Sequence, residues 1–283
     1  MRNRYGALVL AGIFFGSTGT AQALGPHGIS TMAVGSARLL CGALLLWIFT
    51  RFMPRTSQKM DKRDLWLSAL GMAMYQLTFF GAVKSTGVAI GTVTALGSAP
   101  ALTGVIAFLV TREKPSRTWL IATLITTTGI IFLSSAKGFA HFNIVGFSLA
   151  ICAGASYSLF AVTSKRALSM GVGISEAMTK IFALSALLAF PFLFSGGFSH
   201  LVTGKGIALV LWLGLVPTAL AYLAYAYGLH GVRASTASTL ILAEPATATI
   251  LAAMILNEQI TAKGWVGIVV IVCGLLYLTR ESK

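Results

Sequence analysis

The chain has 283 residues, of which 56% are hydrophobic and 10% charged, and its mean hydropathy is +0.84. Soluble domains usually carry about 25% charged residues, so this composition excludes a soluble enzyme, a nucleic-acid-binding module and a disordered chain. The formal net charge of +14 fits either a nucleic-acid partner or the cytoplasmic loops of a membrane protein. The position of the charges along the chain decides between these two.

Apolar segments fill almost the whole chain. A helix that crosses the hydrocarbon core needs about 20 mostly apolar residues, and a window of that length predicts ten membrane spans with no soluble domain between them. The expected spans are residues 6–24, 30–50, 65–83, 89–110, 118–135, 144–164, 175–195, 206–227, 235–256 and 263–279. The first span also resembles a secretory signal peptide, because Arg2 and Arg4 precede it. We expect it to be retained as a true span.

Lysine and arginine are distributed unevenly between alternate loops. Of the 21 basic residues, 15 lie on the side of the N-terminus and four on the opposite side, while Arg38 and Lys180 lie within spans. Cytoplasmic loops carry the excess of Lys and Arg. The pattern therefore predicts a multi-pass protein of the cell inner membrane with both termini in the cytoplasm, and no nucleic-acid partner.

Motifs of catalysis and metal binding are absent from the sequence. Cys41, Cys152 and Cys273 lie far apart inside spans, and the four histidines are scattered at loops or span ends. There is no GxSxG turn, HExxH pair or nucleotide-binding P-loop. We therefore expect no enzymatic activity, no metal and no cofactor.

The two halves of the sequence are similar to each other. The matched positions are Ala99-Pro100 with Glu244-Pro245, Glu113 with Glu258 and Gly129 with Gly274, each at an offset of 145. A duplication of five spans predicts repeats at residues 1–140 and 141–283. Because five is odd, the second repeat enters the membrane in the opposite orientation. The expected fold is an all-α membrane protein of ten transmembrane helices as two inverted five-helix repeats, an architecture typical of secondary transporters and found in some channels.

Several motifs carry a family resemblance. They are Glu244-Pro245, Ile255-Leu256-Asn257-Glu258, Gly264-Trp265-Val266-Gly267 and Gly274 in the second half, and Phe15-Gly16-Ser17, Arg38-Leu39-Leu40, Pro100, Glu113 and Gly129 in the first. Together they resemble the EamA domain of the drug/metabolite transporter superfamily, with phenylalanine at position 15 in place of the family's tryptophan. The resemblance covers essentially the whole chain and implies a transporter. Family members export amino acids and other metabolites, and relatives carry nucleotide sugars or cationic drugs.

Two charged residues are expected deep in the membrane, where a charge costs at least about 2.5–3.5 kcal/mol and should face the bundle or a wet cavity. Glu244 is interpreted as a proton carrier or a partner for a substrate amino group, with a buried structural acceptor as the equal alternative. Arg38 is a candidate carboxylate anchor, because guanidinium binds carboxylates bidentately. The favoured interpretation of Arg38 is structural: its side chain either donates hydrogen bonds to backbone carbonyl groups or extends to the outer surface of the membrane.

Polar and aromatic side chains share faces of several spans and are candidate substrate contacts. Besides Glu244 and Arg38 they are Tyr75, Phe79, Ser98, Tyr157, Tyr222 and Tyr225. Each single aromatic residue in a span is more often a packing residue or an interfacial anchor. Pro100 and Pro245, one in each repeat, are predicted gating positions, because proline removes a backbone donor and weakens the helix around it.

The leading functional interpretation is a secondary-active transporter that exports small polar metabolites, with amino acids as the first substrate class, by alternating access. Protons are the candidate coupling ion. The alternatives are efflux of cationic or aromatic drugs and a passive channel for small solutes. The sequence leaves the substrate and the oligomeric state open.

Overall fold

The expected ten-span, all-α membrane architecture is confirmed by a computed structural model, which describes residues 2–53, 56, 58–135 and 143–279. Ten helices of this part are long and apolar enough to cross a membrane. No expected span extends more than one residue beyond its helix. The helices are Arg2–Leu24, Thr31–Arg51, Lys62–Gly87, Ile90–Thr111, Arg117–Ser135, Ile144–Ser169, Ile174–Phe194, Gly204–Gly231, Ala234–Leu256 and Ala262–Thr279. The predicted boundary at 140/141 lies outside the described residues, as do Arg55, Lys137, Arg280 and Lys283 of the charge count.

Breaks and distortions divide some spans into shorter elements. The elements are α1 (Arg2–Leu24), α2 (Thr31–Arg51), α3 (Lys62–Thr111), α4 (Arg117–Ser135), α5 (Ile144–Ser169), α6 (Ile174–Ala189), η1 (Phe190–Phe194), α7 (Phe198–Leu201), α8 (Gly204–Gly214), η2 (Leu215–Leu220), α9 (Ala221–Gly231), α10 (Ala234–Leu240), α11 (Ala243–Leu256) and α12 (Ala262–Thr279). The long α3 holds two spans joined at Gly87, whose φ of 83° lies in the left-handed region that glycine adopts without steric cost.

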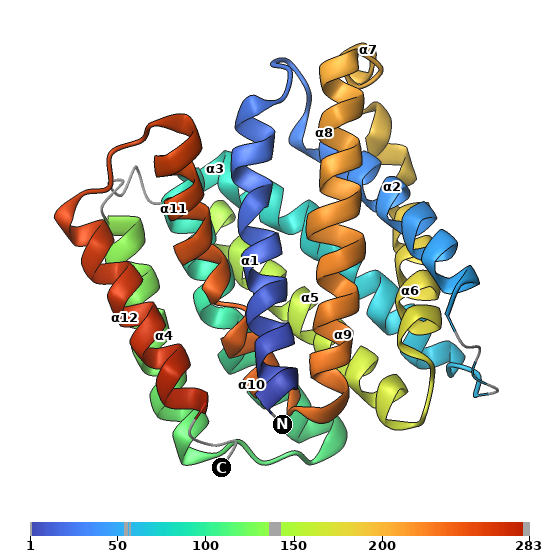
Figure 1. Cartoon of the computed structure of the whole chain (residues 1–283), viewed down its shortest axis with the longest axis vertical. Helices are drawn as coiled ribbons and strands as arrows, with labels where there is room; N and C mark the ends of the chain where they lie inside the picture. Colours follow the sequence, from blue (N-terminus) through green and yellow to red (C-terminus); the bar gives the residue numbers. More distant parts are fainter. Residues whose placement is uncertain (1, 54–55, 57, 136–142, 280–283) are drawn as a thin grey trace.

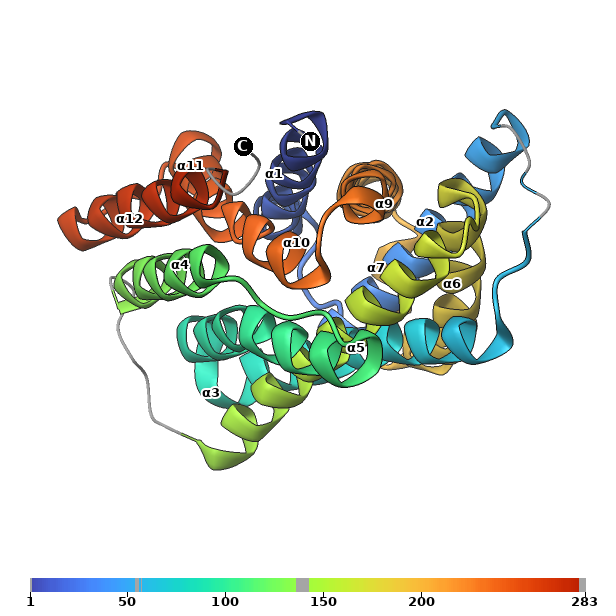
Figure 2. The ribbon, with the colours of Figure 1, turned by 90° about the horizontal axis from the view of Figure 1, so that it is seen from below.

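The helices form two rows. In one row α1 packs between α11 and α9, and in the other α3 packs against α4 and most extensively against α5 (Figures 1 and 2). At the edges α12 pairs with α4, and α2 pairs with α6. The start of α1 and the end of α12 lie on the same side of the molecule (Figure 1), as an even number of spans requires.

Apolar side chains cover the outer surface as well as the core. Phe160, Phe182 and Tyr225 are fully buried, whereas Trp47 and Leu109 are exposed. Large exposed apolar patches mark a surface that contacts a partner or a membrane, and here ten spanning helices carry them. The lipid bilayer is therefore the solvent of this surface.

Candidate functional site

A cavity of about 660 Å³ lies between the two rows of helices. Its walls come from α1, α2, α3, α4, α5, α9, α10 and α11. The lining begins at Phe15 on α1 and includes Gln22 near that helix's end, Thr31 at the start of α2, and Leu256 at the end of α11. These ends lie on the side opposite the start of α1. The cavity therefore extends toward the face opposite the termini.

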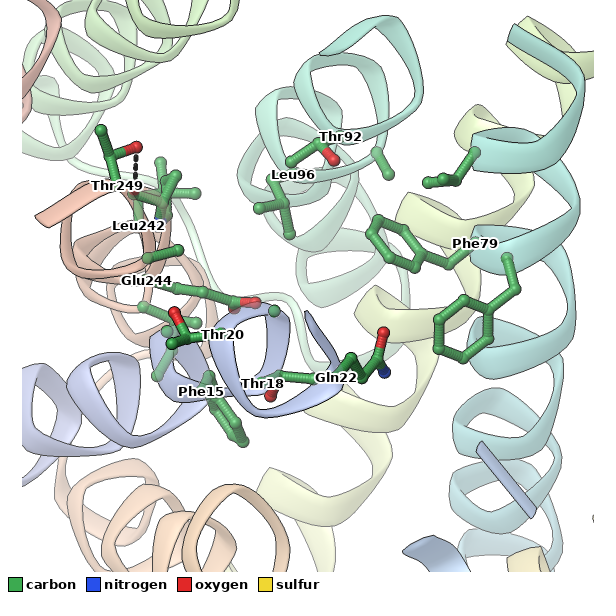
Figure 3. Close-up of a pocket in the computed structure, with 18 of the residues that line it drawn as sticks. Phe15, Thr18, Thr20, Gln22, Phe79, Thr92, Leu96, Leu242, Glu244 and Thr249 are labelled. Atoms are coloured by element: carbon green, nitrogen blue, oxygen red, sulfur yellow. Dashed lines mark hydrogen bonds between the residues drawn. The ribbon is translucent and has the colours of Figure 1, made fainter. Parts of the chain in front are cut away.

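Most of the predicted contact residues line this cavity. They are Arg38, Tyr75, Phe79, Tyr157, Tyr222 and Glu244, together with the predicted gating residue Pro245. They come from α2, α3, α5, α9 and α11, so side chains far apart in the sequence meet at one place. Figure 3 shows Glu244 pointing into the cavity from α11, with Phe79 on the other side.

Three predicted residues lie outside the lining. The hydroxyl of Ser98 donates to the Ala95 carbonyl (3.3 Å), at a point where α3 packs against Gly154. Tyr225 is fully buried behind the wall, with its ring 5.9 Å from that of Phe160. Pro100 is buried within α3, which continues through it. The structure therefore places these residues at helix contacts and not at the cavity surface.

Arg38 is held by a distorted segment of span eight. Its Nε donates to Thr218 Oγ1 (2.9 Å) and its Nη2 to the Pro217 carbonyl (3.1 Å). Because Pro217 has no N–H, the carbonyl of Leu213 needs another donor, and the Thr218 hydroxyl supplies it (2.7 Å). The segment η2 is accordingly a π-helix, a feature often found at functional sites. Nη1 of Arg38 makes no hydrogen bond to the described residues.

Span nine is interrupted just before Glu244, within one turn of Pro245, the proline predicted to weaken this helix. α10 ends at Leu240 and α11 begins at Ala243, so Pro245 lies in the first turn of α11, where the missing N–H has no helical partner to lose. The carbonyl of Ile241 receives the N–H of Glu244 instead (2.8 Å). The break therefore fixes Glu244 at the start of a half-helix.

Two glycines of α1 allow that helix to pack directly on the break. A Cβ at Gly12 would lie 3.1 Å from the Ile241 carbonyl oxygen, and one at Gly16 would lie 2.9 Å from the Glu244 carbonyl oxygen. The neighbouring Phe15 lines the cavity with its ring 4.8 Å from that of Tyr222. The Phe15-Gly16-Ser17 motif thus combines close packing with a cavity wall.

Arg38 and Glu244 line the same cavity without forming an ion pair with each other. Within the described residues they form no ion pair at 4 Å or less, and the Glu244 carboxylate has no hydrogen bond. Tyr75 and Tyr222 line the same cavity. The cavity therefore has a cationic pole at Arg38, an anionic pole at Glu244 and an aromatic wall that includes Tyr75 and Tyr222.

Other polar lining residues escaped the sequence reasoning. They are Thr18, Thr20, Gln22, Gln76, Thr92, Ser134, Ser238 and Thr249. Most of these residues are small and uncharged. Such residues are common in membrane spans, so the sequence alone does not identify them as part of a site. Gln76 was detectable, because an amide in the middle of a span must find a partner.

Basic side chains connect the helices at the end of the molecule where the termini lie. Lys165 Nζ on α5 donates to the carbonyls of Leu229 (2.8 Å) and His230 (3.0 Å) at the end of α9. Arg4 on α1 lies 3.0 Å from the His230 ring, Nη1 to Nδ1. Cations at a helix C-terminus are stabilised by its carbonyl groups. These contacts join α1, α5 and α9 beneath the cavity.

The cavity's donor set does not resemble a metal centre. In the part of the chain that the structure describes, no three His, Cys, Asp or Glu side chains gather closely enough to hold a metal ion. The side chains that line the cavity offer one guanidinium, the carboxylates of Glu244 and Glu258, amides, hydroxyls and aromatic rings.

Comparisons with known proteins agree on a family. A sequence model described as the EamA-like transporter family matches residues 4–135 and 144–280. The "Uncharacterized transporter YwfM" of Bacillus subtilis is 36% identical over 291 residues, covering 99% of this chain and 95% of the relative. The "Uncharacterized inner membrane transporter YicL" of Salmonella typhimurium is 23% identical and covers 98% of this chain and 95% of the relative. One solved crystal structure has a TM-score of 0.82 at 16% identity, covering 99% of this chain and 98% of its own, and so shares the fold.

Proposed function

Since the chain belongs to the EamA-like transporter family, we propose that it is a secondary-active transporter that exports small zwitterionic metabolites, with amino acids as the substrate class. Its family makes it a multi-pass membrane transporter and not an enzyme.

The observation that carries the proposal is that one cavity holds two opposite charges, those of Arg38 and Glu244, which form no ion pair with each other. A guanidinium binds a carboxylate with charge-assisted hydrogen bonds, and the Glu244 carboxylate accepts hydrogen bonds from an ammonium group. An α-amino acid supplies both groups. The cavity volume of about 660 Å³ is that of a typical small-molecule site, and the aromatic wall favours an apolar part of the solute.

Alternating access is supported by the asymmetry of the cavity. It extends to the face opposite the termini, while Lys165, Arg4 and His230 join helices at the other end. With the termini in the cytoplasm, as the basic loops predict, this arrangement releases substrate to the outside. The sequence has no P-loop, so the energy comes from a gradient. Protons are the proposed coupling ion, with Glu244 as the carrier.

Counterflow in proteoliposomes tests the proposal. Vesicles are loaded with an unlabelled compound, and the transient uptake of the same labelled compound is measured for a panel of amino acids, nucleotide sugars and cationic dyes. We expect transient accumulation of zwitterionic amino acids. Accumulation of cationic aromatic compounds alone would establish drug efflux instead. Equilibration of the amino acids without accumulation would establish a channel.

A further inference from the structure

We infer that Gln76 determines specificity by holding the substrate carboxylate together with Arg38. This inference rests on the proposed function, because it assigns a second donor to the carboxylate end of the same site.

Gln76 has the environment of a ligand-binding side chain. It lies in the first span of α3, lines the cavity and is only 4% exposed. Its Nε2 has no hydrogen-bond partner among the described residues. A buried amide nitrogen without a hydrogen-bond partner is costly. A hydrogen bond from this nitrogen to a bound substrate would remove that cost.

Gln76 lies beside the helix that carries Arg38. A Cβ at Gly35 of α2 would lie 3.6 Å from Gln76 Oε1 and 3.0 Å from the Phe80 ring. Gly35 precedes Arg38 by about one helical turn, a rise of about 4.5 Å along α2. The missing side chain at position 35 therefore brings the amide of Gln76 next to the part of α2 from which Arg38 projects.

The chemistry of the two groups matches the two oxygens of a carboxylate. The NH₂ group of a glutamine amide only donates hydrogen bonds, as does a guanidinium. The Nη1 group of Arg38 makes no hydrogen bond to the described residues, so each group has a donor for one oxygen. Thr20 Oγ1 and Tyr157 Oη also lack partners in the described part of the cavity wall. A hydroxyl both donates and accepts, so those two do not select a carboxylate.

The placement predicts how an amino acid is oriented. Arg38 and Gln76 belong to α2 and α3, whereas Glu244 belongs to the half-helix α11. A zwitterion bound between them has its carboxylate at the α2–α3 end and its ammonium group at the α11 end. A neutral amide in place of the substrate carboxylate keeps the ammonium contact and loses the charge that both donors recognise.

The test compares acids with their amides. Binding of L-leucine, L-phenylalanine and L-glutamine, and of the C-terminal amide of each, is measured by calorimetry on the full-length protein in detergent. The variant Gln76→Met removes the donor at nearly constant volume, and Gln58→Met makes the same change at an exposed loop position outside the cavity. We expect Gln76→Met to weaken binding of the acids by roughly tenfold and of the amides by less than about twofold. Gln58→Met should leave the acid-to-amide ratio unchanged.

The outcomes separate this inference from the proposed function. If the wild-type protein prefers the acids and Gln76→Met prefers them equally, the inference is overturned and the proposed function stands. If the wild-type protein binds none of these compounds, or binds acid and amide alike, the proposed function fails and the inference with it. Should Gln76→Met not fold, Gln76→Glu replaces it. Its carboxylate repels the substrate carboxylate, and an unchanged ratio in that variant likewise overturns the inference.

Discussion

At the scale of single residues, the contacts of Arg38 are compatible with both roles that the sequence presented as alternatives. Its Nε and Nη2 hold Thr218 and the Pro217 carbonyl, and the side chain still lines the cavity. Being fixed by η2 on one edge, the guanidinium is oriented before any ligand arrives. Such preorganisation lowers the cost of binding.

The clamp between Arg38 and η2 predicts a stability effect. Thr218→Val keeps the side-chain shape and leaves both Arg38 Nε and the Leu213 carbonyl without their partner. We expect the free energy of unfolding to fall by about 1–3 kcal/mol, measured by thermal unfolding in detergent. The control is Thr128→Val, because the exposed Thr128 bonds only to the Leu124 carbonyl of its own helix (2.8 Å). Equal unfolding temperatures of the two variants would contradict the clamp.

Another prediction at this scale concerns proton coupling through Glu244. Glu244→Gln keeps the size of the side chain but removes the ionisable carboxyl group that we propose exchanges a proton. We expect uptake driven by a pH gradient in proteoliposomes to fall to the level without a gradient. Glu113→Gln makes the same change in the loop between α3 and α4, outside the cavity, and should transport as the wild type does. Full pH-driven uptake by Glu244→Gln would exclude Glu244 as the proton carrier.

At the scale of elements, the contact of α1 with the broken span nine supports the anionic pole. Backbone approaches backbone at Gly12 and Gly16, and the carbonyl of Ile241 is satisfied by the N–H of Glu244. Small residues let membrane helices approach closely enough for such packing. The position of the Glu244 carboxylate therefore depends on a helix that contributes no charge to the site.

This packing predicts that two glycines of one helix respond differently to alanine. A Cβ at Gly16 would lie 2.7 Å from the Thr247 Cβ, whereas a Cβ at Gly19 meets nothing within 4 Å. We expect Gly16→Ala to lower the free energy of unfolding by about 1–3 kcal/mol. Gly19→Ala should be neutral or stabilising, because alanine favours the helix by about 1 kcal/mol. Thermal unfolding of both in detergent checks this, and equal losses would rule out the close contact as the cause.

At the scale of the whole molecule, the cavity extends toward one face of the bundle, the face opposite the termini. The lining residues of α1 begin at Phe15, while Arg4 on the preceding turns contacts His230. Because the cavity extends away from the termini, the side of the membrane on which the termini lie determines the side toward which the cavity extends.

Cysteine labelling tests access and orientation together. Cys41, Cys152 and Cys273 are first replaced by alanine, and Gln22→Cys or Leu8→Cys is then introduced. Gln22 lines the cavity, whereas Leu8 is fully buried. We expect a membrane-impermeant maleimide added outside intact cells to label position 22 and leave position 8 unmodified. Labelling of position 22 only in inside-out vesicles would reverse the predicted orientation.

The sequence alone was sufficient for the spans, because apolar runs of bilayer length have no other stable solution. It also pointed to Arg38 and Glu244, since a charge within a span is costly wherever it lies. The sequence predicts the positions of uncharged polar residues in the site less well. Ser98 and Gln76 are both polar residues within spans, but the Ser98 hydroxyl donates to the Ala95 carbonyl of its own helix, whereas Gln76 Nε2 has no partner among the described residues.

Ten spans, the family and the two intramembrane charges were therefore determined by composition and pattern, which depend on one segment at a time. The tertiary structure decided that Arg38 and Glu244 face one cavity, that span nine breaks before Glu244, and that Gln76 lies beside Gly35. These features depend on contacts between segments far apart in the chain. Helix periodicity states which residues share a face, but the partner of each face is chosen by packing in three dimensions.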